Sequence, residues 1–270
     1  MSAARKTTFE LEDQLTPRQL VALLPALHDL TGHAAAWRGS YILKELQRQP
    51  AQTYERHDLA PDVAFYRGDG QREQKTLIVT FCGRAQRPNM SWSLYLQYLP
   101  SELFDVAILC DRSNNHYYDG IAGYASSMLS LQRRLAEDLQ FSSYRRLICY
   151  GTSSGGLPAI RAGLLGGAHR SIALGGVFAW PIYRLQRGQN FQTFDPICGC
   201  YAGHPGQVLL IHGSNERDLI GARQAEKALG AKRIRVTATS DHNVSHQLYL
   251  AGKLLDFHGR MFEFGNARYF

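Results

Sequence analysis

From about residue 62 onward, short apolar runs alternate with segments whose apolar residues recur at helical spacing. Such runs are typical of buried strands, and the intervening segments are typical of amphipathic helices. The apolar runs are "VAFYR", "TLIVTFC", "FDVAILCD", "RLICY", "SIALGG", "VLLIHG" and "IRVTAT". This alternation predicts an α/β fold in which helices cover both faces of a mostly parallel sheet.

Two details of the same pattern make further predictions. The polar segment "GDGQREQ" between the first two runs is typical of a tight turn, so we expect those two strands to form a hairpin. Near the end of the chain, "HQLYLAGKLLDF" keeps helical spacing throughout and predicts a single last helix.

The N-terminal region has a different pattern, with helices only. Thr16, Pro17 and Gln19 form a capping box with proline at the first helical position, and a second helical stretch ends before Pro50. We expect residues 1–58 to be a helical extension packed on a main domain of residues 59–270. A docking surface for a partner is the alternative.

One apolar run breaks into small residues before helical spacing resumes. Gly151-Thr152-Ser153-Ser154-Gly155 fits the pattern G-x-S-x-G and lies between a predicted strand and a predicted helix. Glycines permit a turn that is too tight for larger side chains, and the central serine then lies at the carboxyl edge of the sheet. Ser153 is therefore the candidate nucleophile, and Ser154 is its alternative.

A serine hydroxyl needs a nearby base, and reactive groups in such sheets gather beyond the carboxyl ends of strands. Asp218 lies seven residues after Ile211, and His242 lies four residues after Ala238, so both follow predicted strands. The chain order is Ser153, Asp218, His242. The alternatives are His246 for the base, and Asp111 or Asp241 for the acid.

Three segments together resemble the α/β-hydrolases, over roughly residues 60 to 258. They are "YGTSSGG" as nucleophile elbow, "LLIHGSNERD" as acid loop and "TSDHNVSH" as histidine loop. The resemblance implies an eight-stranded, mostly parallel sheet and a short lid at about residues 177–206. The N-terminal helices have no counterpart in it.

The resemblance also implies an oxyanion hole made of backbone amides. One amide belongs to Ser154, and the other belongs to the loop "FCGRAQRPN", where Arg84 is preferred and Gly83 is the second choice. Aromatic residues of the expected lid are candidates for substrate binding: Trp180, Tyr183, Phe191 and Phe194.

Composition narrows the classes of partner. Residues 1–75 hold ten basic and ten acidic side chains, so the net charge of +7 comes from scattered arginines further on, not from a stripe that would bind nucleic acid. Cys198 and Cys200 are the one close pair among five cysteines, and no second cluster accompanies them. We therefore expect no metal and no cofactor. The start of the chain lacks an apolar signal core, and we expect a cytoplasmic protein without a membrane span.

These features predict a serine hydrolase with a Ser-His-Asp triad that cleaves a carboxylic ester or thioester through an acyl-enzyme. The partner is then a small-molecule acyl ester or thioester. An acyltransferase that uses the same triad is one alternative. A non-catalytic binding protein of the same fold is another, because fold alone does not establish chemistry.

Overall fold

The computed structural model describes residues 10–30, 40–176, 206–237 and 242–265 of the 270-residue chain. Most of the predicted lid lies outside the described residues. So do its four aromatic residues, the cysteine pair and Asp241. The predictions that concern them stay predictions.

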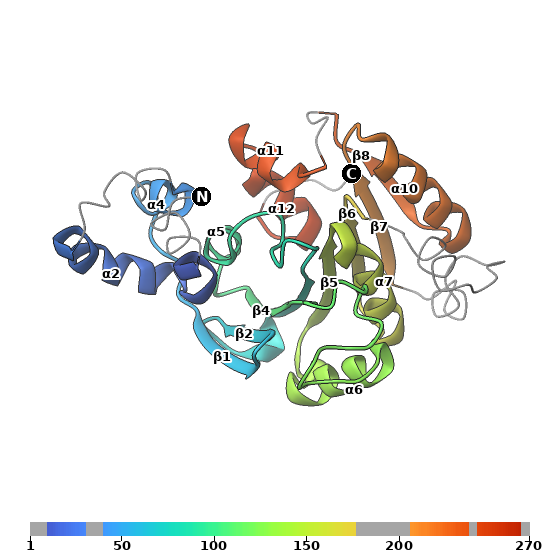
Figure 1. The fold of residues 1–270 in the computed structure, drawn as a ribbon, viewed down its shortest axis with the longest axis horizontal. Helices are drawn as coiled ribbons and strands as arrows, with labels where there is room; N and C mark the ends of the chain where they lie inside the picture. Colours follow the sequence, from blue (N-terminus) through green and yellow to red (C-terminus); the bar gives the residue numbers. More distant parts are fainter. Residues whose placement is uncertain (1–9, 31–39, 177–205, 238–241, 266–270) are drawn as a thin grey trace.

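The described strands form one eight-stranded sheet in the order β1-β2-β4-β3-β5-β6-β7-β8 (Figure 1). The first two strands in this order run antiparallel to their neighbours, and all strands from β4 to β8 are parallel. The strands are β1 (Glu55–Ala60), β2 (Val63–Arg67), β3 (Thr76–Phe81), β4 (Phe104–Leu109), β5 (Arg146–Thr152), β6 (Arg170–Leu174), β7 (Gln207–His212) and β8 (Lys232–Arg235). The predicted mostly parallel sheet is confirmed.

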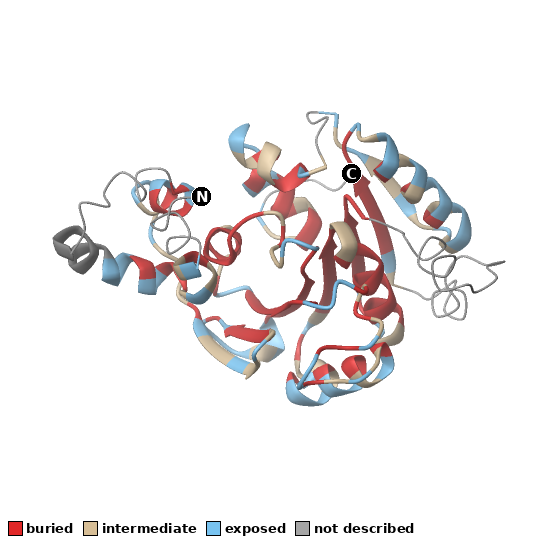
Figure 2. Ribbon diagram, in the orientation of Figure 1, coloured by how far each residue is buried: buried red, intermediate tan, exposed pale blue. Residues whose placement is uncertain are grey.

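Successive side chains of the central strands point to opposite faces of the sheet and belong to apolar layers on both faces. Ile78 and Ile148 belong to one layer, whereas Leu77 and Leu147 belong to the other. This follows from the period of two along a strand, and it leaves every residue of β3, and every residue of β5 except Arg146, buried (Figure 2). Helices on both faces are therefore required to cover the sheet, as predicted.

The helices divide between the two faces (Figure 1). On one side lie α5 (Trp92–Gln97), α11 (Val244–Leu250) and α12 (Leu254–Phe262), with α2 (Pro17–Leu30) and α4 (Tyr41–Leu46) against α5. On the other side lie α6 (Met128–Asp138), α7 (Gly156–Leu165) and α10 (Glu216–Leu229). The predicted capping box is present, because Thr16 and Gln19 each accept a hydrogen bond from the other's backbone amide.

The predicted hairpin between β2 and β3 is wrong. Strand β4 lies between them, and β2 instead forms a hairpin with β1. The sequence pattern did not predict β1, because this edge strand has no fully buried residue and therefore no apolar run. The proposed boundary after residue 58 falls within β1, and the division into extension and main domain stays a prediction.

The prediction of a single last helix is also wrong, because the chain forms two helices there. Between α11 and α12 the chain passes through Gly252 at φ +68°, a left-handed conformation that ends the first helix. The apolar spacing continues across the break because both helices contribute to the same buried layer.

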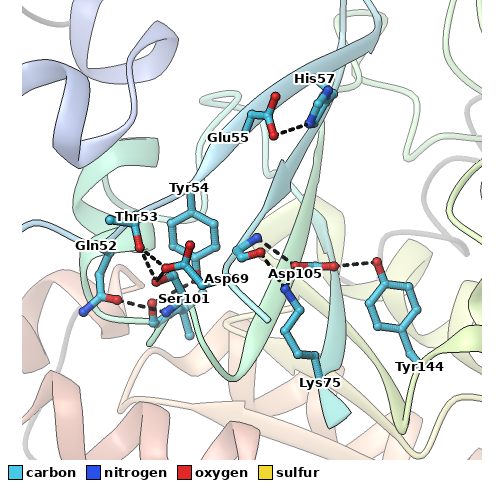
Figure 3. Close-up of polar contacts among 12 residues, drawn as sticks. Gln52, Thr53, Tyr54, Glu55, His57, Asp69, Lys75, Ser101, Asp105 and Tyr144 are labelled. Carbon is cyan, nitrogen blue, oxygen red and sulfur yellow. Dashed lines mark hydrogen bonds and ion pairs between the residues drawn. The ribbon is translucent and has the colours of Figure 1, made fainter. Parts of the chain in front are cut away.

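A buried ion pair links the amino ends of β3 and β4 (Figure 3). Lys75, just before β3, pairs with Asp105 of β4, and both side chains are excluded from solvent. The Lys75 ammonium also donates to the carbonyl of Gly68 at 2.8 Å, and the Asp105 carboxylate accepts from the Gly68 amide at 2.8 Å and the Tyr144 hydroxyl at 2.7 Å. Because these added hydrogen bonds offset desolvation, the pair can be retained in the interior.

Candidate active site

Ser153 follows strand β5 in a left-handed backbone conformation, with φ +52°. It begins a short 3₁₀ turn (Ser153–Gly155) that leads into α7 at Gly156. A non-glycine residue at positive φ is strained, and such strain persists only where the surroundings hold it. The serine thus lies at the carboxyl edge of the sheet.

The two glycines of the motif are required by crowding. A Cβ on Gly151 would lie 2.0 Å from the carbonyl oxygen of Gly155, and one on Gly155 would lie 2.1 Å from that of Phe81. Backbone atoms at such distances cannot be avoided by a side-chain rotation. The turn therefore depends on both glycines, as the sequence pattern predicted.

Ser153, His242 and Asp218 form one chain of hydrogen bonds. Nε2 of His242 lies 2.8 Å from the Ser153 hydroxyl oxygen, and Nδ1 lies 2.9 Å from each carboxylate oxygen of Asp218. An ionised carboxylate only accepts, so Nδ1 must carry the proton and Nε2 is left to accept from the serine. This is the arrangement that a general base needs.

Asp218 is more deeply buried than His242. Asp218 lies in the first turn of α10, whose N-cap Asn215 accepts from the Asp218 amide, and its side chain is only 3% exposed. The His242 side chain is 31% exposed, and its Nδ1 is bonded to the Asp218 carboxylate. The imidazole is thus oriented by the carboxylate and partly exposed at the same time.

The loop after β3 lies directly against the serine. A Cβ on Gly83 would come within 2.9 Å of the Ser153 Cβ, so only a glycine permits this approach. Arg84, the next residue, is exposed. The assignment of the Arg84, Ser154 or Gly83 amides to an oxyanion hole stays a prediction, although Gly83 brings the backbone of this loop beside Ser153.

Two residues beside the site were missed in the sequence. Gly175, at φ +55°, follows β6, and a Cβ there would meet the His242 carbonyl oxygen at 3.0 Å and the Asp218 carboxylate at 3.5 Å. His116 Nδ1 lies 3.0 Å from the Ser154 carbonyl, and burial lowers the pKa of its imidazole, which therefore stays neutral near pH 7. The glycine pair that ends "SIALGG" was a local signal for Gly175, whereas no local pattern marked His116.

The alternative residues make other contacts. His246 lies in the first turn of α11, with its ring 5.4 Å from that of Tyr41. Asp111 accepts from the Tyr117 amide at 2.9 Å. Each of these contacts is a structural one.

Within the described part of the chain, no group of three or more His, Cys, Asp or Glu side chains is arranged to hold a metal ion. In the same residues, no helix has both the length and the apolar character that a bilayer span needs.

No protein-family model matches the chain, and no curated protein sequence matches it. Among solved structures, the acylaminoacyl peptidase of Pyrococcus horikoshii is similar with a TM-score of 0.53 at 13% identity. That match covers 82% of this chain, which spans only 44% of the peptidase chain. The serine hydrolase FphF of Staphylococcus aureus gives a TM-score of 0.48 at 12% identity, covering 76% of this chain and 98% of FphF. At these identities the likeness concerns the fold alone.

Proposed function

We propose that this chain, whose fold is that of the α/β-hydrolases, is a serine hydrolase that cleaves a carboxylic ester or thioester through an acyl-enzyme. The observation that carries the proposal is the chain of hydrogen bonds from Ser153 through His242 to Asp218, at 2.8 and 2.9 Å. With the proton on Nδ1, this chain of hydrogen bonds has the order that nucleophilic attack by a serine requires.

In the first half of the reaction, Ser153 Oγ bonds to the substrate carbonyl carbon while its proton moves to His242 Nε2. The carbonyl electron pair moves to the oxygen and gives a tetrahedral oxyanion. Asp218 stabilises the resulting imidazolium, because its negatively charged carboxylate accepts a hydrogen bond from Nδ1–H, which keeps its proton. When the tetrahedral species collapses, the alcohol or thiol leaves with the proton from Nε2.

In the second half, water repeats these steps on the acyl-enzyme. His242 takes a proton from the water as its oxygen bonds to the acyl carbon, and it returns that proton to Ser153 when the carboxylic acid leaves. Serine and imidazole are thereby regenerated. An acyl acceptor other than water would enter at this step.

The oxyanion is stabilised by backbone amides of the two segments that lie against Ser153. Ser154 contributes the amide next to the nucleophile, and Arg84 contributes the other from the loop after β3, with Gly83 as its alternative. Preorganised donors of this kind are worth about a hundredfold to a thousandfold in turnover each.

Hydrolysis of p-nitrophenyl esters of rising chain length, alongside acyl-coenzyme A thioesters, tests the proposal. We expect turnover of at least one series. His242→Ala should lower it by at least about a thousandfold. The matched control His246→Ala should retain most of it, because that ring packs on Tyr41. No turnover by the folded wild type, or the reverse ranking of the two variants, would contradict the proposal.

A further inference from the structure

A carboxylate near the N-terminus holds the loop that follows β3. Oδ2 of Asp13 accepts from both Nε and Nη2 of Arg87, each at 2.7 Å. Its other oxygen accepts from the backbone amide of Trp92 at 3.2 Å. The pair is largely enclosed, since the side chains of Arg87 and Asp13 are 15% and 26% exposed. It is therefore screened less than a surface ion pair.

The same arginine is tied to the strand that carries the nucleophile. The carbonyl of Arg87 accepts from the hydroxyl of Thr152 at 3.3 Å, and Thr152 is fully buried immediately before Ser153. One residue thus connects two segments. Its side chain contacts the N-terminal region, and its backbone contacts the nucleophile elbow.

The loop needs such external contacts because its own backbone is strained. Gln86 at φ +57° and Asn89 at φ +64° flank Arg87 in left-handed conformations. Each costs on the order of 1 kcal/mol, which contacts from outside must offset. Besides the Asp13 contact, the Trp92 indole donates to the Gln86 carbonyl at 3.0 Å. The loop conformation thus depends on the residues packed around it.

We propose that Asp13 is a positioning residue, which holds the loop of Arg84 against Ser153 through Arg87. This rests on the proposed function, since Arg84 lies three residues before Arg87 and contributes the proposed oxyanion amide. The N-terminal region, which has no counterpart in the family resemblance, then completes the active site. A displacement of about 1 Å in such a loop can cost a hundredfold in rate.

The charges around Asp13 give the contact a pH dependence. Desolvation raises the pKa of Asp13 to about 6 although Arg87 opposes it, and the neighbouring Glu12 carboxyl adds to the rise. Burial also raises the pKa of Glu12, which accepts from the Ser40 hydroxyl. Arg56 faces the same turn and donates to the carbonyls of Asp13 and Gln14 at 3.1 and 2.7 Å. Asp13 is thus ionised at pH 8 and loses its charge as the pH falls through about 6.

A double-mutant cycle measures the positioning role. The second-order rate of labelling by a fluorophosphonate probe is compared at pH 8 in wild type, Asp13→Asn, Arg87→Gln and the double variant, with folding checked by circular dichroism. We expect each single change to slow labelling by roughly tenfold to a hundredfold, because the oxyanion donor is displaced. The double variant should be no slower than the slower single variant, since both changes break one contact.

The matched control is Glu226→Gln, which removes a carboxylate from an arginine pair with Arg233 on α10 and β8. It should label at the wild-type rate. A wild-type rate in Asp13→Asn, or effects that multiply in the double variant, would overturn the positioning role. If Asp13→Asn does not fold, Arg87→Lys replaces it, because lysine keeps the charge and loses the planar fork. A wild-type rate there would overturn the role equally.

The pH profile adds a readout that a purely structural contact would not move. The ratio of the wild-type rate to the Asp13→Asn rate should fall toward one between pH 8 and pH 5, because Asp13 loses its charge in this range and effects common to both proteins cancel in the ratio. A constant ratio would contradict the proposal. A folded wild type that never labels would instead refute the proposed function itself, and this inference with it.

Discussion

At the scale of single residues, the site is built by glycines as much as by its reactive side chains. Gly151 lets the turn close behind Ser153, Gly83 lets the neighbouring loop approach it, and Gly175 makes room for the His242–Asp218 pair. Each position excludes a Cβ by contact with backbone atoms or with Ser153, His242 or Asp218. The geometry of the site therefore depends on these glycines, which have no Cβ, as well as on the side chains of Ser153, His242 and Asp218.

Crowding and backbone conformation can be separated by two glycine substitutions. Gly151→Ala should destabilise the protein by about 3 kcal/mol, because its Cβ would meet the Gly155 carbonyl. Gly230→Ala should cost only about 1 kcal/mol, because that glycine adopts φ +62° in open space. Chemical denaturation of both variants measures the difference. Equal losses would show that the elbow tolerates a side chain.

The sequence pattern predicted that three polar residues would lie together, but it did not predict the residues around them. Ser153, Asp218 and His242 each follow a strand, and parallel strands place those positions at one edge. Their roles stay predictions. His116 and Gly175 could not be found in this way, because their contacts join segments that are unrelated in local pattern. The same is true of Asp13, which lies 74 residues before Arg87.

At the scale of elements, the buried pair of Lys75 and Asp105 joins β3 to β4, and its partners Gly68 and Tyr144 extend the link to the ends of β2 and the approach to β5 (Figure 3). It lies at the amino ends of the parallel strands, whereas Ser153 lies at their carboxyl end. Stability and chemistry are therefore expected to respond separately to changes here.

Asp105→Ala should reduce the free energy of unfolding by about 3 kcal/mol or more, because it leaves the Lys75 ammonium buried without its counter-ion. The control Asp58→Ala removes a pair with Arg56 in which the carboxylate is 58% exposed, and should cost less than about 1 kcal/mol. Denaturant titration gives both values. Fluorophosphonate labelling per folded molecule should be unchanged in both variants. A variant that loses labelling but keeps its stability would contradict the expected separation of stability from chemistry.

The element order shows what local patterns predict well. Each of the seven apolar runs overlaps a strand, and six of these strands are largely buried, since a buried run needs only its own side chains to be recognised. The seventh run, "IRVTAT", overlaps β8 at Ile234 and Arg235, and no residue of β8 is fully buried. The hairpin prediction failed because turn residues such as those of "GDGQREQ" do not determine which strands become neighbours. Every residue of β3 is buried, and this strand pairs on both sides with parallel strands from elsewhere in the chain. Pairing is decided by packing across the whole sheet.

At the scale of the whole molecule, buried titratable groups give the fold opposing responses to acid. His258 of α12 lies among the rings of Tyr95, Tyr98 and Phe262, and desolvation lowers its pKa to about 4. The unfolded chain takes up this proton at about pH 6.5, so the fold loses stability as the pH falls from there to about 4. Asp13, with its raised pKa, contributes the opposite sign in an overlapping range.

His258→Gln should therefore make stability less dependent on pH. The wild type loses at most about 3 kcal/mol through this group between pH 6.5 and 4, and the variant lacks that loss. Melting temperatures measured across this range should converge for the two proteins at low pH, although the variant is less stable at pH 8. Parallel curves would contradict the buried, neutral state of His258.

The central claim is that Ser153 is an activated nucleophile, and site-resolved labelling tests it most directly. A fluorophosphonate forms an adduct that resembles the acyl-transfer transition state, so it reacts with a serine that has a base and oxyanion donors in place. Mass spectrometry should find one adduct, on the tryptic peptide of residues 147–161, in wild type and in Ser154→Ala but not in Ser153→Ala. An adduct that persists in Ser153→Ala, or a folded wild type that never reacts with small or large probes, would contradict the claim.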